Sequence, residues 1–213
     1  MRSTPELLTL QALRLAGFAE ERAIADRALL PAGQLGDLLD GAVRSGYVEP
    51  LRFAEAHGWI LTETGHARLA ALLERDVDDA DARDVLATTI AEFERPEGIN
   101  ARFVETVSKW QLRSTAAVQP ALGAAEDLEA LLSELAVLGE RLRTVLAALS
   151  DRLPRFGRYP AHYDLAMRRA RSEGLGWVTG VGILSCHAVW AELHQDLRSS
   201  VGEDRTPEVG DRR

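Results

Sequence analysis

The sequence predicts a mainly α protein, in which three helices, a two-strand hairpin and a fourth helix precede an all-helical domain. Apolar residues recur at three- and four-residue spacing through most of the 213 residues, which is typical of amphipathic helices. Between residues 47 and 61 the pattern changes to two short extended runs with a loop between them, which indicates a β-hairpin.

Proline and glycine delimit the helices of the N-terminal part. The first helix spans Pro5–Gly17, with proline near its start and glycine at its end. A short second helix spans Glu20–Arg27. A third helix spans Pro31–Ser45, because proline is favoured at the first helical position. Its predicted buried face consists of Leu35, Leu38, Leu39 and Val43.

The hairpin and the helix after it complete this first domain, residues 1–75. We expect strands at Tyr47–Leu51 and Trp59–Leu61, with a loop over Arg52–Gly58. Either Thr62 or Thr64 can cap the next helix, because a threonine hydroxyl accepts a hydrogen bond from a free backbone N–H group.

Two segments carry a resemblance to a known family. LLDGAVRSGYVEP and GWILTETGHARLAALL resemble the recognition helix, wing and following helix of winged helix-turn-helix regulators, including the MarR-like group. In that group a hydrophobic-x-Leu-Thr-x-x-Gly motif commonly ends the wing. The resemblance covers residues 5–75 and implies that the Pro31–Ser45 helix enters a major groove of double-stranded DNA, bound by a homodimer.

The outward side chains of this domain give a mixed signal for DNA binding. The expected base readers are Gln34 and Arg44, and the expected phosphate contacts are Arg22, Arg27, Arg52 and, in the wing, His57. Asp37, Asp40 and Glu55 oppose them, because phosphates repel carboxylates. Residues 1–76 carry a net charge of −3, so a domain that contacts another protein is the alternative.

The second domain, residues 80–202, is predicted to contain about five helices after an acidic connector at residues 76–85. The expected helices are Asp84–Phe93, Asn100–Arg113, Ala125–Arg152, His162–Arg171 and Trp177–Val201. Residues 114–123 form a loop, and the polar residues 203–213 form a disordered tail.

Charge is unevenly distributed along this second domain. Residues 77–140 carry a net charge of −8 and residues 141–200 a net charge of +4. The arginine-rich stretch from Arg141 to Arg171 is expected to neutralise the acidic segment, and a pocket for an anionic ligand is the alternative. The long leucine-rich helix Ala125–Arg152 fits either an internal core or a dimer interface.

Tryptophan and histidine residues of this domain suggest a site for a small-molecule effector. The expected ligand-binding residues are Trp110, Trp177, Trp190 and His187. The segments VSKWQLRS and HAVWAELHQDLRSSVGEDR resemble an uncharacterised actinobacterial helical domain found with phosphoenolpyruvate-utilising enzymes. That resemblance implies an alternative function, an accessory or interaction protein for such an enzyme.

Several function classes find no support in the sequence. It contains no phosphate-binding glycine loop, nucleophile elbow, HExxH or CxxC motif, so we expect no enzyme and no cofactor. Two histidines seven residues apart, His187 and His194, do not make a metal site. A lone cysteine, Cys186, is expected to be a small buried apolar residue. The absence of a signal or membrane span predicts a cytoplasmic protein, and 24 arginines against one lysine suggest a GC-rich, actinobacterial genome. The leading hypothesis is a DNA-binding transcriptional regulator that responds to an effector.

Overall fold

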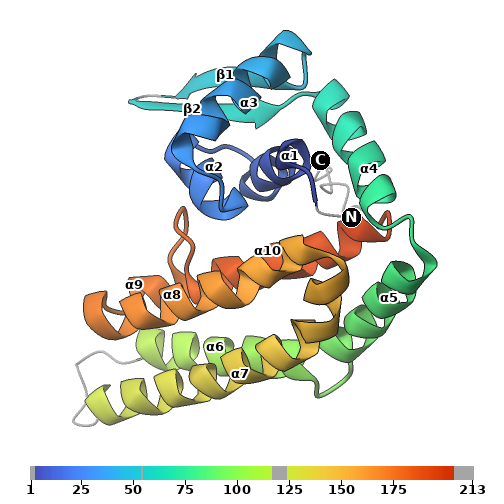
Figure 1. Ribbon diagram of the computed structural model, residues 1–213. Coiled ribbons are helices and arrows are strands. Elements are labelled where there is room, and N and C mark those ends of the chain that lie inside the picture. Colours follow the sequence, from blue (N-terminus) through green and yellow to red (C-terminus); the bar gives the residue numbers. More distant parts are fainter. Residues whose placement is uncertain (1–2, 54, 117–123, 204–213) are drawn as a thin grey trace, which may run out of the picture. The chain divides into compact units, whose positions relative to one another are not determined.

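The computed structural model describes residues 3–53, 55–116 and 124–203, and the chain divides into two compact units. Unit 1 comprises residues 1–80 and 194–213, and unit 2 comprises residues 81–193. The mainly α fold with one two-strand sheet is confirmed (Figure 1). In the described residues no helix is both long enough and apolar enough to cross a membrane.

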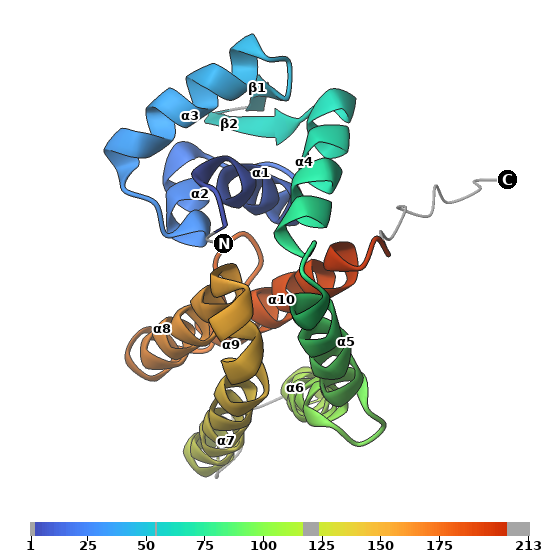
Figure 2. The same cartoon turned by 45° about the vertical axis from the view of Figure 1, so that its right-hand side comes forward.

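Unit 1 has the element order that the sequence predicts. Its elements are α1 (Pro5–Ala16), α2 (Glu21–Ala28), α3 (Ala32–Arg44), β1 (Val48–Phe53), β2 (Ala56–Leu61) and α4 (Glu63–Asp76). At the start of α1 the Thr4 hydroxyl accepts a hydrogen bond from the Leu7 amide at 3.2 Å, and Gly17 ends the helix with a positive φ of 71°. Figure 2 shows the hairpin and α4 beside α1.

One apolar core joins these elements, and it explains their arrangement. Helices α1, α3 and α4 turn leucine-rich faces inward, α2 adds Ile24 and Ala28, and the hairpin adds Val48 and Leu61. The fully buried leucines and isoleucine at its centre are Leu7, Leu10, Leu13, Ile24, Leu35, Leu39 and Leu69. Burying each such side chain contributes about 1.5–3 kcal/mol, so this core holds α3 and the hairpin in fixed positions within the unit.

The hairpin is longer and tighter than expected, so the predicted loop over Arg52–Gly58 is wrong. The strands pair antiparallel from Val48–Leu61 to Phe53–Ala56, so Arg52, Phe53 and residues 56–58 belong to strands. Arg52 and His57 therefore lie opposite each other in the ladder. Backbone pairing extends through these polar residues because one face of a two-strand sheet can be exposed to water.

A third short stretch joins the hairpin, and no local sequence pattern predicts it. The Trp59 amide donates to the Ala19 carbonyl at 2.9 Å, and the Ala19 amide donates to the Trp59 carbonyl at 3.2 Å. The α1–α2 connection is thereby tied to β2, as a one-residue third strand.

The junction between the hairpin and α4 depends on Thr62 rather than Thr64. The Thr62 hydroxyl accepts from the Gly65 amide at 3.0 Å and donates to the Gly46 carbonyl at 2.6 Å. The Thr62 amide donates to the Tyr47 carbonyl at 3.1 Å. This one residue caps α4 and also links it to the end of α3.

Unit 2 is a bundle of helices around an aromatic centre. Its elements are α5 (Ala80–Glu94), α6 (Ile99–Ala116), α7 (Ala124–Arg152), the 3-10 turn η1 (Pro154–Gly157), α8 (Arg158–Glu173), α9 (Gly176–Thr179) and the first half of α10 (Cys186–Ser200). Helix α7 packs against both α6 and α8. Phe93, Phe103, Tyr163 and Trp190 are all buried.

Two helices of unit 2 begin earlier than expected. Helix α5 begins at Ala80, inside the acidic connector, and α8 begins at Arg158 rather than His162. Pro160 falls in the first turn of α8. Proline is tolerated there, because the first backbone N–H groups of a helix have no carbonyl partner within it.

The predicted single helix Trp177–Val201 is wrong, since residues 180–185 separate α9 from α10. Gly182 has a φ of +82°, a conformation that residues other than glycine rarely adopt. The Ser185 hydroxyl donates to the Gly180 carbonyl at 2.8 Å and accepts from the Ala188 amide at 3.2 Å, so Ser185 caps α10. Apolar periodicity continues across this break and conceals it.

The compact units differ from the expected domains at their C-terminal end. Residues from His194 onward, which we expected in the helical domain and the tail, group with unit 1. There the buried Gln11 side chain donates to Asp196 Oδ1 at 2.8 Å, and Asp196 is fully buried. Residues 204–213 of the predicted tail lie outside the described residues, as do 117–123 of the predicted loop.

Candidate functional site

The outer face of α3 is the first part of the candidate site. Both expected base readers, Gln34 and Arg44, are exposed there. Asp37 and Asp40 are exposed on the same helix between them. The arginine is in the last turn of α3, where it also offsets the negative end of the helix dipole. The face therefore offers one amide and one guanidinium group beside two carboxylates.

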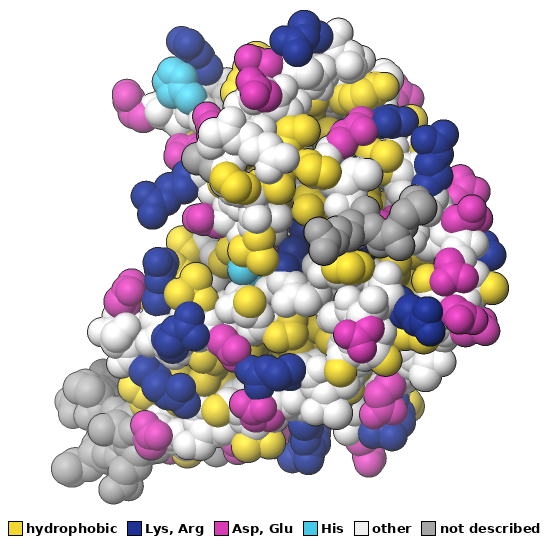
Figure 3. Space-filling model, viewed as in Figure 1, with side chains coloured by type: hydrophobic (Ala, Val, Ile, Leu, Met, Phe, Trp, Pro, Cys, Tyr) yellow, Lys and Arg dark blue, Asp and Glu magenta, His cyan; other side chains and the backbone are white. Residues whose placement is uncertain are grey.

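The hairpin supplies the second part of the site. Arg52 and His57 are exposed and are paired across the two strands. Figure 3 shows a histidine side chain next to a basic one at the hairpin edge of unit 1, with acidic side chains nearby. Glu49 and Glu55 are also exposed in this segment. The structure thus places two expected phosphate contacts directly beside each other, in a region of mixed charge.

The two remaining expected phosphate contacts differ in accessibility. Arg22 is exposed on α2. Arg27 is only 8% exposed, and its guanidinium donates to the Ala23 carbonyl at 3.2 Å. A side chain buried to this extent has little surface to offer a phosphate, so Arg27 functions mainly in packing α2.

A groove of about 280 Å³ runs between α1 and α3 in unit 1. It is lined by Glu6, Thr9, Asp37, Leu38, Ser45 and Tyr47, among others. Arg68 donates to both Glu6 oxygens at 2.8 Å, and this hydrogen bonding lowers the pKa of the Glu6 carboxyl below its ordinary value. The Arg68 guanidinium carbon also lies 5.9 Å from the centre of the Tyr47 ring. The Glu6 carboxylate is therefore already neutralised within the fold.

Trp190, expected to bind a ligand, is instead part of the core of unit 2. It is 2% exposed, and its ring stacks on Phe103 with 4.2 Å between centroids and 5° between planes. Its indole N–H donates to Asn100 Oδ1 at 3.0 Å. The exposed His187 ring lies edge-on to the same Phe103 ring, with 6.4 Å between centroids.

The other two tryptophans of the expected ligand site lie in different environments. The Trp177 indole N–H donates to Glu173 at 2.9 Å, and the Arg169 guanidinium carbon lies 4.4 Å from the ring centroid. Trp110 is half-buried on α6. Phe103 contacts both Trp190 and His187. None of the four expected ligand-binding residues lines either of the two grooves described here.

A second groove, of about 320 Å³, lies between α6 and α7, and it was not predicted from the sequence. It is lined by Arg102, Thr106, Ser133, Glu134, Val137, Leu138 and Arg141. The Thr106 hydroxyl donates to Glu134 at 3.1 Å. The one sequence feature that could have indicated this groove is the mixture of short and charged residues on the outer face of the long helix, opposite its leucines.

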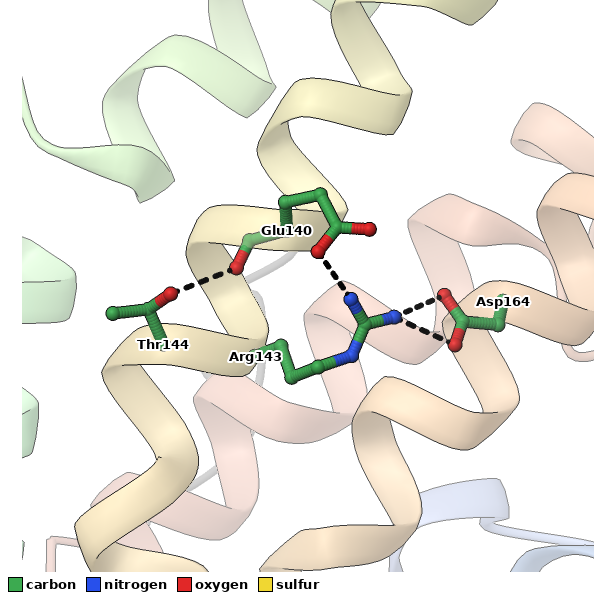
Figure 4. A network of polar contacts seen from close by, with 4 residues as sticks. All are labelled: Glu140, Arg143, Thr144 and Asp164. Carbon is green, nitrogen blue, oxygen red and sulfur yellow. Dashed lines mark hydrogen bonds and ion pairs between the residues drawn. The ribbon is translucent and has the colours of Figure 1, made fainter.

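Several arginines of the basic stretch are engaged with acidic residues of unit 2. Arg143 on α7 donates to both oxygens of Asp164 on α8, at 2.9 and 2.8 Å, and pairs with Glu140 (Figure 4). Arg152 lies 3.6 Å from Asp81 at the start of α5. These pairs agree with neutralisation within the fold.

The described residues contain no group of three or more His, Cys, Asp or Glu side chains placed to hold a metal ion. Cys186 is fully buried at the start of α10, as expected, and burial raises the pKa of its thiol to about 12. No protein-family model matches the chain, and no curated protein or solved structure is significantly similar to it.

Proposed function

We propose that unit 1 is a winged helix-turn-helix domain and that the chain is a DNA-binding transcriptional regulator. The order α1, α2, α3, β1, β2, α4 supports this assignment, as does the short bridge from Ala19 to β2. In this proposal α3 enters the major groove and the hairpin forms the wing.

The observation that carries the proposal is the combination of an exposed α3 and an adjacent basic pair on the hairpin. Gln34 and Arg44 present amide and guanidinium donors, the groups that read base edges. Arg52 and His57 face outward from directly paired positions and can contact phosphates. Arg22 adds a further exposed cation, whereas Arg27 takes no part.

The test is the binding of purified protein to duplex DNA, followed by fluorescence anisotropy at two salt concentrations. The duplexes are the segment upstream of the protein's own gene and a random sequence of equal length. Binding should weaken steeply with salt, because phosphate contacts release counterions. Arg44→Ala should weaken binding to the preferred duplex by roughly tenfold to a hundredfold.

A matched control keeps this test specific. Arg83 is an exposed arginine on α5 in unit 2, and Arg83→Ala should leave the affinity unchanged. Equal losses for the two variants would attribute binding to general charge rather than to α3. An absence of binding to either duplex at low salt would overturn the proposal.

A second candidate function, docking on another protein, is favoured by the carboxylates and apolar residues of the same region. Asp37 and Asp40 are exposed on α3. Leu29, Val43 and Leu51 are large apolar side chains exposed in the same unit. A phosphoenolpyruvate-utilising enzyme is the partner class suggested by the sequence resemblance. Under this alternative, Asp40→Asn would weaken binding to the purified enzyme, and no DNA would bind.

A further inference from the structure

The outer face of α7 has the composition of a helix surface that packs against another helix. Opposite its buried leucines it presents Ala130, Ser133, Glu134, Val137, Arg141, Thr144 and Ala148, all exposed. Five of these seven side chains are short, so a second helix could approach closely. Val137, at the middle of the face, is 56% exposed, and Val104 on neighbouring α6 is 54% exposed.

The charges on this face are placed symmetrically about its centre. Glu134 and Arg141 lie seven residues apart on α7, which is about 10 Å along the helix axis. The point between Val137 and Leu138 is therefore about 5 Å from each of them along the axis. Within one chain they are too far apart to pair. In the described part of the chain, Arg141 forms no ion pair, whereas nearby Arg143 pairs with Asp164.

We propose that this face binds a second copy of the chain, with the two α7 helices antiparallel around a two-fold axis beside Val137. In such an arrangement the same surface of both copies makes the contact, with the two helices running in opposite directions. Glu134 of one copy then faces Arg141 of the other, and the same pair forms twice. Val137 of each copy enters the shallow groove that Arg102, Thr106 and Ser133 line on the other.

Charge complementarity is the argument for a second copy as the occupant. This face of α7 carries one acid and one base at equal distances from its centre, so a reversed copy of the same face pairs with both. A helix of 29 residues, about 44 Å long, is long enough to support an interface of ordinary size. This inference does not rest on DNA binding.

The test is sedimentation equilibrium of the full chain and of charge-reversed variants, across a wide range of protein concentrations. The wild type should form a dimer. Glu134→Arg and Arg141→Glu should each weaken the dimer by roughly tenfold or more, because each creates two like-charge contacts. The double variant E134R/R141E should restore the dimer, because it swaps the two charges and places opposite charges face to face again.

A matched control separates the proposed pair from the general effect of charge. Glu129 is exposed on the same helix but points about 140° away from Glu134, so Glu129→Arg should leave the dimer unchanged. Circular dichroism would establish that each variant is folded. A wild type that stays monomeric, a dimer that neither single reversal weakens, or a double variant that stays as weak as the single ones would overturn the proposal.

Discussion

Gly65 packs against the backbone of Tyr47 so closely that a β-carbon at position 65 would lie 1.9 Å from the Tyr47 carbonyl oxygen. That carbonyl also accepts the Thr62 amide, so it cannot move away without breaking the link between β2 and α4. The glycine of the Leu-Thr-x-x-Gly motif thus has a steric role in this chain. It lets the first turn of α4 lie against the end of α3.

Gly65→Ala should destabilise unit 1 by about 3 kcal/mol, the upper end of the usual cost of overpacking, because the added methyl group meets backbone rather than a movable side chain. Urea unfolding followed by circular dichroism measures the loss. Gly36→Ala is the control, since a β-carbon there meets nothing within 4 Å and the residue lies inside α3. It should be neutral or stabilise by up to about 1 kcal/mol. Equal effects of the two substitutions would contradict this role of Gly65.

The Glu6–Arg68 ion pair should make a small contribution that depends on pH. Because Arg68 lowers the pKa of Glu6, the stabilisation is present above the pKa of the unfolded chain, about 4.3. It is lost as pH falls through the lower pKa of the folded state. More than a third of the Glu6 side chain is exposed, so Glu6→Gln should cost below about 1 kcal/mol at neutral pH.

Urea unfolding at a series of pH values checks this contribution of the ion pair. The stability difference between the wild type and Glu6→Gln should shrink as the pH falls from neutrality to strongly acidic values. A difference that stays constant or grows on acidification would show that Glu6 contributes by packing rather than by charge.

Trp190 should be essential to the stability of unit 2. Trp190→Ala removes the ring stacked on Phe103 and should cost about 3–5 kcal/mol. Trp190→Phe keeps a ring but loses the hydrogen bond to Asn100, and should cost about 1 kcal/mol from that bond. Val181→Ala, at a residue 98% exposed, is the control and should be close to neutral. A near-neutral Trp190→Ala would contradict the packing described here.

The Cys186 thiol should react only when the protein unfolds. At mildly alkaline pH, the ionised fraction of a thiol with a pKa of about 12 is roughly a thousandfold smaller than that of a free cysteine. Alkylation by iodoacetamide should therefore be slow in the native protein and fast in urea. Rapid alkylation of the native protein would place this side chain at an accessible surface.

The first domain could be predicted from the sequence because its boundaries are marked by residues with strong local preferences. Pro5 and Gly17 delimit α1, and Thr62 caps α4, as their conformational preferences indicate. The hairpin length could not be predicted, because Arg52 and His57 are polar and extend the ladder on an exposed face. The bridge from Ala19 depends on a long-range contact that leaves no local pattern.

The candidate ligand site shows where composition misleads. Trp190 was expected to line a pocket, but its ring fills the space among Phe93, Phe103 and Tyr163. In a sequence, a tryptophan on an apolar helical face looks the same whether it packs in a core or lines a pocket. The distinction depends on which helices pack against the tryptophan. For α10, the break at residues 180–185 determines which helices these are. The α6–α7 groove required the same three-dimensional information.

The measurement that tests DNA binding by α3 most directly is the affinity for duplex DNA when the carboxylates of α3 are neutralised. Asp37 and Asp40 lie between the expected base readers Gln34 and Arg44 on α3, and their negative charges oppose phosphates. The D37N/D40N variant should therefore bind roughly fivefold more tightly than the wild type at low salt, while Arg44→Ala binds more weakly. Glu129→Gln, which removes an exposed carboxylate from unit 2, should change nothing. If D37N/D40N leaves the affinity unchanged, or if none of these proteins binds DNA, α3 does not face nucleic acid and the regulator proposal is contradicted.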